Sequence, residues 1–179
     1  MTTKHFMLIL LSSVILTGCK PRVYEYTKIS GFAQGTSYHI TYENSKGKNY
    51  KADIESILND FNKSLSIWDS TSVISRINKN DPAVEADDWF VASFKKATEI
   101  NKISGGAFDI TVGPVVHAWG FSTAPVAKHD QAYIDSLMQF VGMEKVKLEK
   151  RKVIKASPGV QIDMNGLAQG YSTDIVCHF

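Results

Sequence analysis

The sequence has few cysteines and none of the spacings that bind metals. Its 179 residues include two cysteines, Cys19 and Cys177, with no C-x-x-C pair. The five histidines show no metal-ligand spacing, which argues against a zinc site. The sequence also has no large excess of positive or negative residues, because its formal net charge is only +2. The sequence therefore offers no strong basic field of the kind that favours nucleic-acid binding.

Several common catalytic motifs are missing as well. The sequence contains no G-x-S-x-G nucleophile elbow, no G-x-G-x-x-G dinucleotide motif and no G-K-[ST] phosphate loop. What remains is an ordinary globular composition, with 44% hydrophobic and 21% charged residues. This length and composition allow one domain with a sizeable core, or part of a larger domain.

The long hydrophobic run is confined to the N-terminus. Residues 6–16 are mostly apolar, too short for a membrane span of about 20 residues but suited to a signal-peptide core. Gly18 and Cys19 follow, and the segment resembles the lipobox of bacterial lipoproteins. We expect a signal peptide over residues 1–19, a lipidated Cys19 and a tether over residues 20–28. A plain signal peptide with a chance cysteine is the alternative. The domain would be anchored in the cell envelope, facing the periplasm or another extracytoplasmic side.

Hydrophobic periodicity predicts helices over residues 53–65, 73–77, 88–104 and 130–141, and another that begins near residue 165. Ser72, Asp87 or Asp88, and Asp130 are the expected N-terminal caps. Strand patterns predict a hairpin around residues 31–36, a second hairpin over 145–149 and 152–156, and a short strand over 160–164. Because these elements do not alternate strictly, we expect an α+β fold with a mixed sheet and packed helices.

Residues 105–121 (GGAFDITVGPVVHAWGF) form the most unusual segment. No regular helix or strand favours this mixture, so we expect a functional loop; a tight structural turn is the alternative. Asp109 and Thr111 can bind polar groups, while Trp119 and Phe121 can stack on a flat ring. Residues 31–36 and 163–171 are further candidate loops. Asp163, taken alone, is interpreted as a capping acid of a helix whose N-terminus suits phosphate.

Four segments in this order resemble the ApbE-type FAD:protein FMN transferases, formerly described as thiamine-biosynthesis lipoproteins. Residues 31–36 (GFAQGT) are similar to G-x-x-M-G-T, and residues 66–78 (SIWDSTSVISRIN) to S-x-[YW]-[DN]-x-x-S-x-[IL]-S-R-[FIL]-N. Residues 105–121 match G-A-[FM]-D-x-T-V-G-P-[LV]-V-x-x-W-G-F nearly throughout, and residues 163–171 resemble D-x-x-x-[IL]-[AG]-[KEQ]-G-[YF]. The resemblance implies a T-fold-like domain over residues 29–179.

The resemblance also implies a function. Members of this family bind FAD and Mg²⁺, transfer the FMN half to a threonine or serine hydroxyl of a target protein and release AMP; some hydrolyse FAD instead. Membrane respiratory-complex subunits are the acceptors that the family suggests. The motifs assign FAD contacts to Gln34, Trp68, Ala107, Phe108, Asp109, Asp163 and Gln169, and a metal contact to the main-chain carbonyl of Gly166. They assign no catalytic side chain.

The sequence departs from the family pattern at three points. Gln34 replaces a methionine, and Gln169 stands where lysine is frequent. Family members also continue beyond this point with the side chains that hold the metal, so we expect this chain to be a C-terminally truncated family domain. Three hypotheses follow: a flavin transferase, a non-catalytic FAD-binding or flavin-trafficking lipoprotein, or a fragment that does not fold stably.

Overall fold

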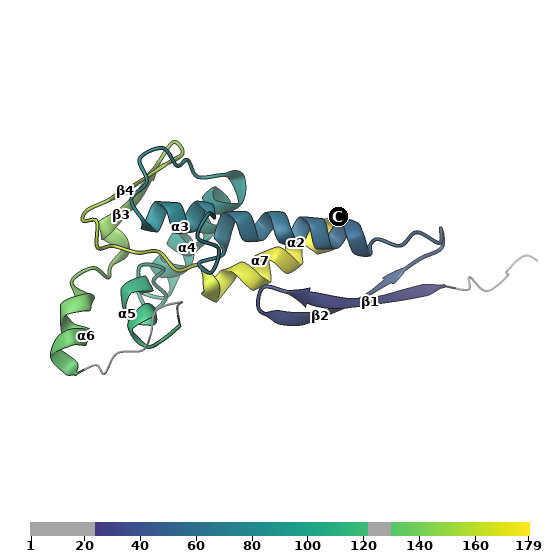
Figure 1. Ribbon diagram of the computed structural model, residues 1–179, viewed down its shortest axis with the longest axis horizontal. Helices are drawn as coiled ribbons and strands as arrows, with labels where there is room; N and C mark the ends of the chain where they lie inside the picture. The colour runs from purple at the N-terminus through teal and green to yellow at the C-terminus, as the bar shows by residue number, and fades with distance from the viewer. Residues whose placement is uncertain (1–23, 122–129) are drawn as a thin grey trace, which may run out of the picture. The chain divides into compact units, whose positions relative to one another are not determined.

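The computed structural model describes residues 24–121 and 130–179 (Figure 1). The predicted signal peptide and Cys19 lie outside the described residues. Contacts divide the described chain into two units, which are treated separately below. One comprises residues 24–30 and His39–Asn49, and the other Gly31–Tyr38 and Tyr50–Phe179.

The first strands, β1 (Tyr26–Ala33) and β2 (Thr36–Glu43), form the hairpin that the sequence predicts. Within the first unit, Asn44 closes the hairpin base. Its backbone N–H donates to the Glu25 carbonyl at 2.6 Å, and its Nδ2 donates to Thr27 Oγ1 at 2.7 Å. Because β1 begins at Tyr26, the last residues of the predicted tether belong to this strand.

Four helices enclose the core of the second unit: α2 (Lys51–Leu65), α3 (Val73–Asn78), α4 (Asp88–Ile103) and α7 (Asn165–His178). Helix α2 contacts the other three, and α2 and α7 lie side by side in Figure 1. The predicted caps are confirmed, since Ser72 Oγ accepts from Ser75 N–H at 3.1 Å and Asp87 Oδ1 from Phe90 N–H at 2.8 Å. Local side-chain chemistry therefore sets where these helices begin.

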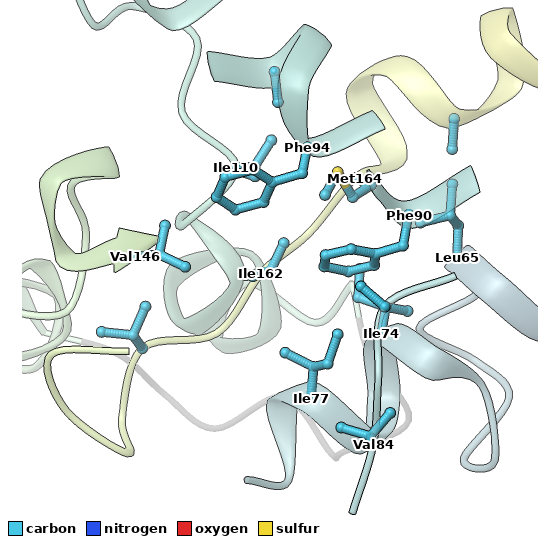
Figure 2. Close-up of a cluster of buried hydrophobic side chains, with 14 of the residues drawn as sticks. Leu65, Ile74, Ile77, Val84, Phe90, Phe94, Ile110, Val146, Ile162 and Met164 are labelled. Carbon is cyan, nitrogen blue, oxygen red and sulfur yellow. The ribbon is translucent and has the colours of Figure 1, made fainter. Parts of the chain in front are cut away.

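The core lies where the segment of residues 160–164 crosses the helices. Val160, Ile162 and Met164 are fully buried, and Figure 2 shows Ile162 and Met164 among side chains from α2, α3 and α4. The buried cluster comprises Phe61, Leu65, Ile74, Ile77, Val84, Ala86, Phe90, Phe94, Ala97, Ile110, Val146, Val160, Ile162, Met164 and Ala168. Apolar burial of this extent is the main favourable term in folding.

The predicted strand over residues 160–164 is not formed. The segment makes a single parallel bridge, Val112 to Gln161, and Asp163 N–H donates to the Ile110 carbonyl at 2.7 Å. The side chain of Asn78 takes the place of a second neighbouring strand. Its Oδ1 accepts from Ile162 N–H at 2.7 Å, and its Nδ2 donates to the Ile162 carbonyl at 2.8 Å. An amide can satisfy both backbone groups of one residue, so no continuous ladder is needed.

The α+β class is as predicted, but the mixed sheet differs from the prediction. Within the described residues, the named strands make two separate two-stranded sheets. The second consists of β3 (Val146–Glu149) and β4 (Lys152–Lys155), which pair antiparallel with Val146 opposite Lys155. This hairpin is tied to the 84–88 region, because Arg151 Nη1 donates to the Ala86 carbonyl at 2.9 Å and Lys152 Nζ to the Val84 carbonyl at 2.8 Å.

Residues 105–121 are less irregular than predicted, since they contain helix α5 (Gly113–Ala118). Pro114 stands in the first turn, where a missing N–H costs nothing. Gly113 is required by packing, because a Cβ there would lie 2.7 Å from the Gln161 carbonyl oxygen. Trp119 and Phe121 are 63% and 66% exposed. Part of this glycine-rich pattern therefore serves a close backbone approach.

Helix α6 (Gln131–Met138) is shorter than the predicted helix over residues 130–141. Its predicted cap is confirmed, because Asp130 Oδ1 accepts from Tyr133 N–H at 2.9 Å. Lys145 Nζ donates to the carbonyls of Gln139 and Val141 at 2.8 and 2.6 Å, which satisfies backbone groups just after the helix. The helical spacing of residues 130–141 predicts that Met138 faces inward, but the structure leaves it 50% exposed. A short 3-10 helix, η1 (Met143–Lys145), leads from there into β3.

Across residues 24–121 and 130–179, every helix is too short or too polar to cross a membrane.

Candidate functional site

A hollow of about 310 Å³ lies between the tip of the β1–β2 hairpin, the C-terminal end of α2 and the first turns of α7. All of these segments belong to the second unit. The lining residues are Gln34, Phe61, Asn62, Leu65, Ser66, Trp68, Asn165, Ala168 and Gln169. Its size is at the lower end of the range for small-molecule sites, about 300–1,000 Å³. The hollow has room for one ring system.

Trp68 stands on a short loop fixed by hydrogen bonds. The indole is 56% exposed. Ser72 Oγ donates to the Ser66 carbonyl at 2.7 Å, and Trp68 N–H donates to Ser66 Oγ at 3.3 Å. Beside it, the hydroxyl and the backbone N–H of Thr71 hold the pKa of Asp69 below its ordinary value. The loop therefore presents a large aromatic surface from a defined backbone.

Gln34 occupies the turn between β1 and β2 in a strained conformation. Its φ is +53° and that of Gly35 is +77°, the paired left-handed angles of a tight hairpin turn. Such angles are uncommon for a residue with a Cβ. Its Oε1 accepts from Ser172 Oγ at 3.1 Å. Its Nε2 is buried and has no hydrogen-bond partner among the described residues. A left-handed backbone conformation together with a buried, unpaired side-chain donor beside a hollow is a combination that binding sites often show.

We expect Gln34→Met to raise the free energy of unfolding by about 1 kcal/mol, because methionine removes a buried unpaired donor. Ser172 keeps its other partner, the Gln169 carbonyl at 2.9 Å. Urea denaturation followed by circular dichroism measures the change. Gln169→Met is the matched control, since Gln169 is exposed and should change stability by less than about 0.5 kcal/mol. A Gln34→Met protein that is no more stable than wild type would contradict this account.

Two further predicted residues, Phe108 and Gly166, meet at the start of α7. A Cβ at Gly166 would lie 3.0 Å from Phe108 Cε2, so the Phe108 ring packs against this glycine. Asp163 is only 7% exposed, and its Oδ1 accepts from Asn165 N–H at 2.7 Å. Its carboxylate thus accepts one backbone N–H of the first turn of α7 from the position before the N-cap, which is Met164 and not the predicted Asp163.

Asp109 is held by protein groups on both carboxylate oxygens. Oδ1 accepts from Thr111 N–H at 2.7 Å and from Thr111 Oγ1 at 2.5 Å. Oδ2 accepts from Met143 N–H at 3.0 Å, and the Thr111 hydroxyl oxygen accepts from Gly142 N–H at 2.6 Å. This network fastens the segment before β3 to the segment before α5. Asp109 therefore has a structural role in addition to its predicted contact with FAD.

Because of this network, Asp109→Ala should lower the free energy of unfolding by about 1–3 kcal/mol in the absence of any ligand. The loss arises because Met143 N–H and the Thr111 groups lose a charged acceptor. Thermal denaturation without FAD tests it. Asp60→Ala is the control, since Asp60 pairs with Lys63 on the exposed face of α2 and such pairs contribute little. Unchanged stability in Asp109→Ala would show that the network is not stabilising.

The structure brings some of the predicted FAD-contacting residues together and leaves others apart. Gln34, Trp68 and Gln169 line one hollow. Phe108 and Gly166 contact each other beside it, and Ala107 is exposed. The carboxylates of Asp109 and Asp163 accept hydrogen bonds from protein groups. Sequence reasoning missed the polar lining residues Asn62, Ser66 and Asn165. Ser66 and Asn165 stand inside recognised motifs, which is the signal that could have found them.

The described residues do not form a metal site by themselves. Among residues 24–121 and 130–179, no three His, Cys, Asp or Glu side chains are placed to share a cation. Gly166 lies in the first turn of α7, and one carbonyl cannot supply the six or more oxygen ligands of a hard divalent cation. The predicted Gly166 contact stays a prediction, and these residues alone do not fit Mg²⁺.

Fold and hollow together define an α+β domain with a ring-sized site beside the N-terminus of a helix. The family model of the ApbE family matches residues 34–179, and the chain belongs to this family. It is 32% identical over 162 residues to the FAD:protein FMN transferase of Haemophilus influenzae, covering 83% of this chain and 47% of that protein. It is 29% identical over 188 residues to the Vibrio cholerae protein of that name, covering 98% and 55%.

The solved structures agree with this placement. The flavin transferase ApbE of Vibrio cholerae superposes with a TM-score of 0.80 and 26% identity, covering 87% of this chain and 53% of that chain. The predicted family and fold class are thereby confirmed. The chain spans about half the length of the curated relatives it matches.

Proposed function

We propose that this chain carries FAD-binding residues of an FAD:protein FMN transferase. The observation that supports this most directly is the convergence of Gln34, Trp68 and Gln169 on one hollow, in a chain of the ApbE family. These residues come from three segments that are far apart in the sequence. Their convergence is what a shared ligand requires.

The hollow suits one ring system of FAD, with the rest of the molecule outside it. Trp68 offers an exposed indole face for stacking. Asn62, Ser66, Asn165 and Gln169 supply amide and hydroxyl groups at the rim, while Phe61, Leu65 and Ala168 supply apolar wall. An apolar wall with a few polar groups is typical of cofactor sites.

In the proposed reaction, a threonine or serine hydroxyl oxygen of a target protein attacks the phosphorus of the FMN half. The bond from that phosphorus to the bridging oxygen breaks, AMP leaves with this oxygen, and the hydroxyl proton passes to solvent. The role of the described residues is to bind and orient FAD, and we assign no catalytic side chain. Since these residues do not fit Mg²⁺, we propose that any requirement for this cation concerns transfer and not FAD binding by this chain.

The test is a titration of the purified chain with FAD, followed by quenching of tryptophan fluorescence, with AMP release measured in parallel. We expect saturable quenching that EDTA changes by less than about twofold, because the described residues contain no metal cluster. AMP release with Mg²⁺, together with FMN covalently bound to an acceptor peptide, would identify a transferase. Binding without AMP release would favour the non-catalytic FAD-binding or flavin-trafficking lipoprotein. Absence of binding would refute both.

We also propose a location and a class of partner. The apolar run at residues 6–16 and the lipobox-like Cys19 support a lipid-anchored protein of the cell envelope, facing an extracytoplasmic side. A respiratory-complex subunit flavinylated on threonine or serine is the proposed acceptor. Metabolic labelling with a fatty-acid probe tests the anchor, and Cys19→Ala should abolish the label.

A further inference from the structure

Helix α3 connects two segments that line the proposed FAD site. At its N-terminal end, Ser72 Oγ and Ser75 Oγ both donate to the Ser66 carbonyl, at 2.7 and 3.3 Å. Ser66 lines the hollow, and Trp68 follows on the same short loop. This end of α3 therefore fixes the wall of the hollow that carries the indole.

At the other end of α3, the side chain of Asn78 holds the segment that leads into α7. Its Oδ1 accepts from Ile162 N–H at 2.7 Å, and its Nδ2 donates to the Ile162 carbonyl at 2.8 Å. These contacts pair both polar backbone groups of a residue that is fully buried. An amide carries one acceptor and one donor side by side, so neither a carboxylate nor an apolar side chain of similar size can replace it.

The C-terminal end of α3 is itself held in place. Lys155 Nζ donates to the carbonyls of Ile77 and Asn78 at 3.2 and 3.3 Å, and a cation is favourable at this end of a helix. Ile74 and Ile77 are buried in the core (Figure 2). The Asn78 amide therefore extends from a backbone that is anchored on two sides.

The path from Ile162 to the hollow is short. Met164, the N-cap of α7, follows two residues later and is fully buried. Asn165 and Gln169, in the first turns of α7, line the hollow. Because a close-packed interior transmits displacements, a shift of Ile162 would move these two lining residues.

We propose that Asn78 is a positioning residue of the FAD site, which sets the first turn of α7 against the Trp68 loop through the backbone of Ile162. The inference rests on the proposed function, because it takes the hollow to bind a ring of FAD. Asn78 does not line the hollow and acts through Asn165 and Gln169, which do. Helix α3 thereby sets the spacing between two walls of the site.

The experiment compares Asn78→Ala with Val84→Ala in the whole chain. Val84 is 7% exposed and does not line the FAD hollow, so Val84→Ala shows what a loss of stability does by itself. Urea denaturation measures the stability of each variant, and titration with FAD gives the dissociation constants under conditions where both are folded. We expect Asn78→Ala to weaken FAD binding at least about fivefold, and Val84→Ala to leave it within about twofold of wild type.

Hydrogen–deuterium exchange without FAD measures the positioning independently of the ligand. Peptides over residues 162–169 should exchange at least about tenfold faster in Asn78→Ala than in Val84→Ala, with α4 as the internal reference. The reason is that Ile162 N–H loses its acceptor and the first turn of α7 loosens.

Asn78→Asp is a second variant for the case that Asn78→Ala does not fold. It keeps the size of the side chain and the acceptor for Ile162 N–H, but places an oxygen against the Ile162 carbonyl. It should also weaken FAD binding at least about fivefold.

The outcomes separate this proposal from the proposed function. FAD binding by the folded Asn78 variants as tight as by Val84→Ala would overturn the positioning role, and so would equal exchange over residues 162–169. Failure of wild type to bind FAD would refute the proposed function instead. The exchange measurement would then decide by itself whether Asn78 positions the first turn of α7.

Discussion

Replacing Trp68 with alanine is expected to weaken FAD binding by about 1–3 kcal/mol, roughly five- to 150-fold, because the stacking surface for a ring is lost. The indole is 56% exposed at the rim of the hollow, so its removal leaves no buried cavity. The fold should therefore survive, and the loss should appear in the dissociation constant alone. Titration with FAD, read by the quenching of flavin fluorescence, measures it in wild type and variant.

Trp119→Ala is the matched control for this experiment. Trp119 is 63% exposed, follows helix α5 and does not line the hollow. Its loss should leave the FAD dissociation constant within about twofold of wild type. Equal weakening by both variants would show that stacking at the hollow is not what binds FAD. It would also return Trp119 and Phe121 to consideration as ring-stacking residues, the other possibility that the sequence offers.

Replacing Phe90 with alanine should lower the free energy of unfolding by about 3–5 kcal/mol. The side chain is fully buried, and its ring stacks on Phe94 with centroids 6.3 Å apart. Figure 2 shows it beside Ile74 and facing the segment that carries Ile162 and Met164. A loss of this size is a large part of the 5–15 kcal/mol typical of a domain. Urea denaturation followed by far-ultraviolet circular dichroism measures it.

Phe32→Ala provides a control with the same chemical change. Phe32 is 73% exposed in β1, so truncation removes little buried surface. Its effect on stability should stay within about 0.5 kcal/mol. A small effect in both variants, or the absence of any cooperative transition in wild type, would favour the hypothesis that the chain does not fold stably by itself.

Helix boundaries were the part of the fold most open to prediction from sequence. Ser72, Asp87 and Asp130 cap helices through backbone N–H groups only three residues away. Such contacts are local, so residue type and spacing are sufficient to find them. The short strand over residues 160–164 was predicted wrongly for the opposite reason. Its backbone partners, Asn78 and residues 110–112, are distant in sequence, and periodicity carries no information about which group will pair.

The candidate site shows the same difference between what local sequence predicts and what long-range contacts decide. Motif resemblance named Gln34, Trp68 and Gln169, but only the packing of α7 against α2 places them around one hollow. Asn62 was missed because a polar residue on a helix surface gives no local sign of lining a site. Asp109 was recognised as a polar group for a ligand, yet its acceptor role toward Met143 depends on a contact across 34 positions.

By itself, the sequence determined the family, the α+β class and most helix starts, because these depend on motifs and on neighbours within a turn. The tertiary structure decided which predicted contacts share a hollow, which carboxylates are engaged by backbone N–H groups, and which backbone groups the Asn78 amide pairs. Those properties depend on segments that meet only when the apolar core closes. Burial around that core, not local pattern, sets their hydrogen bonds.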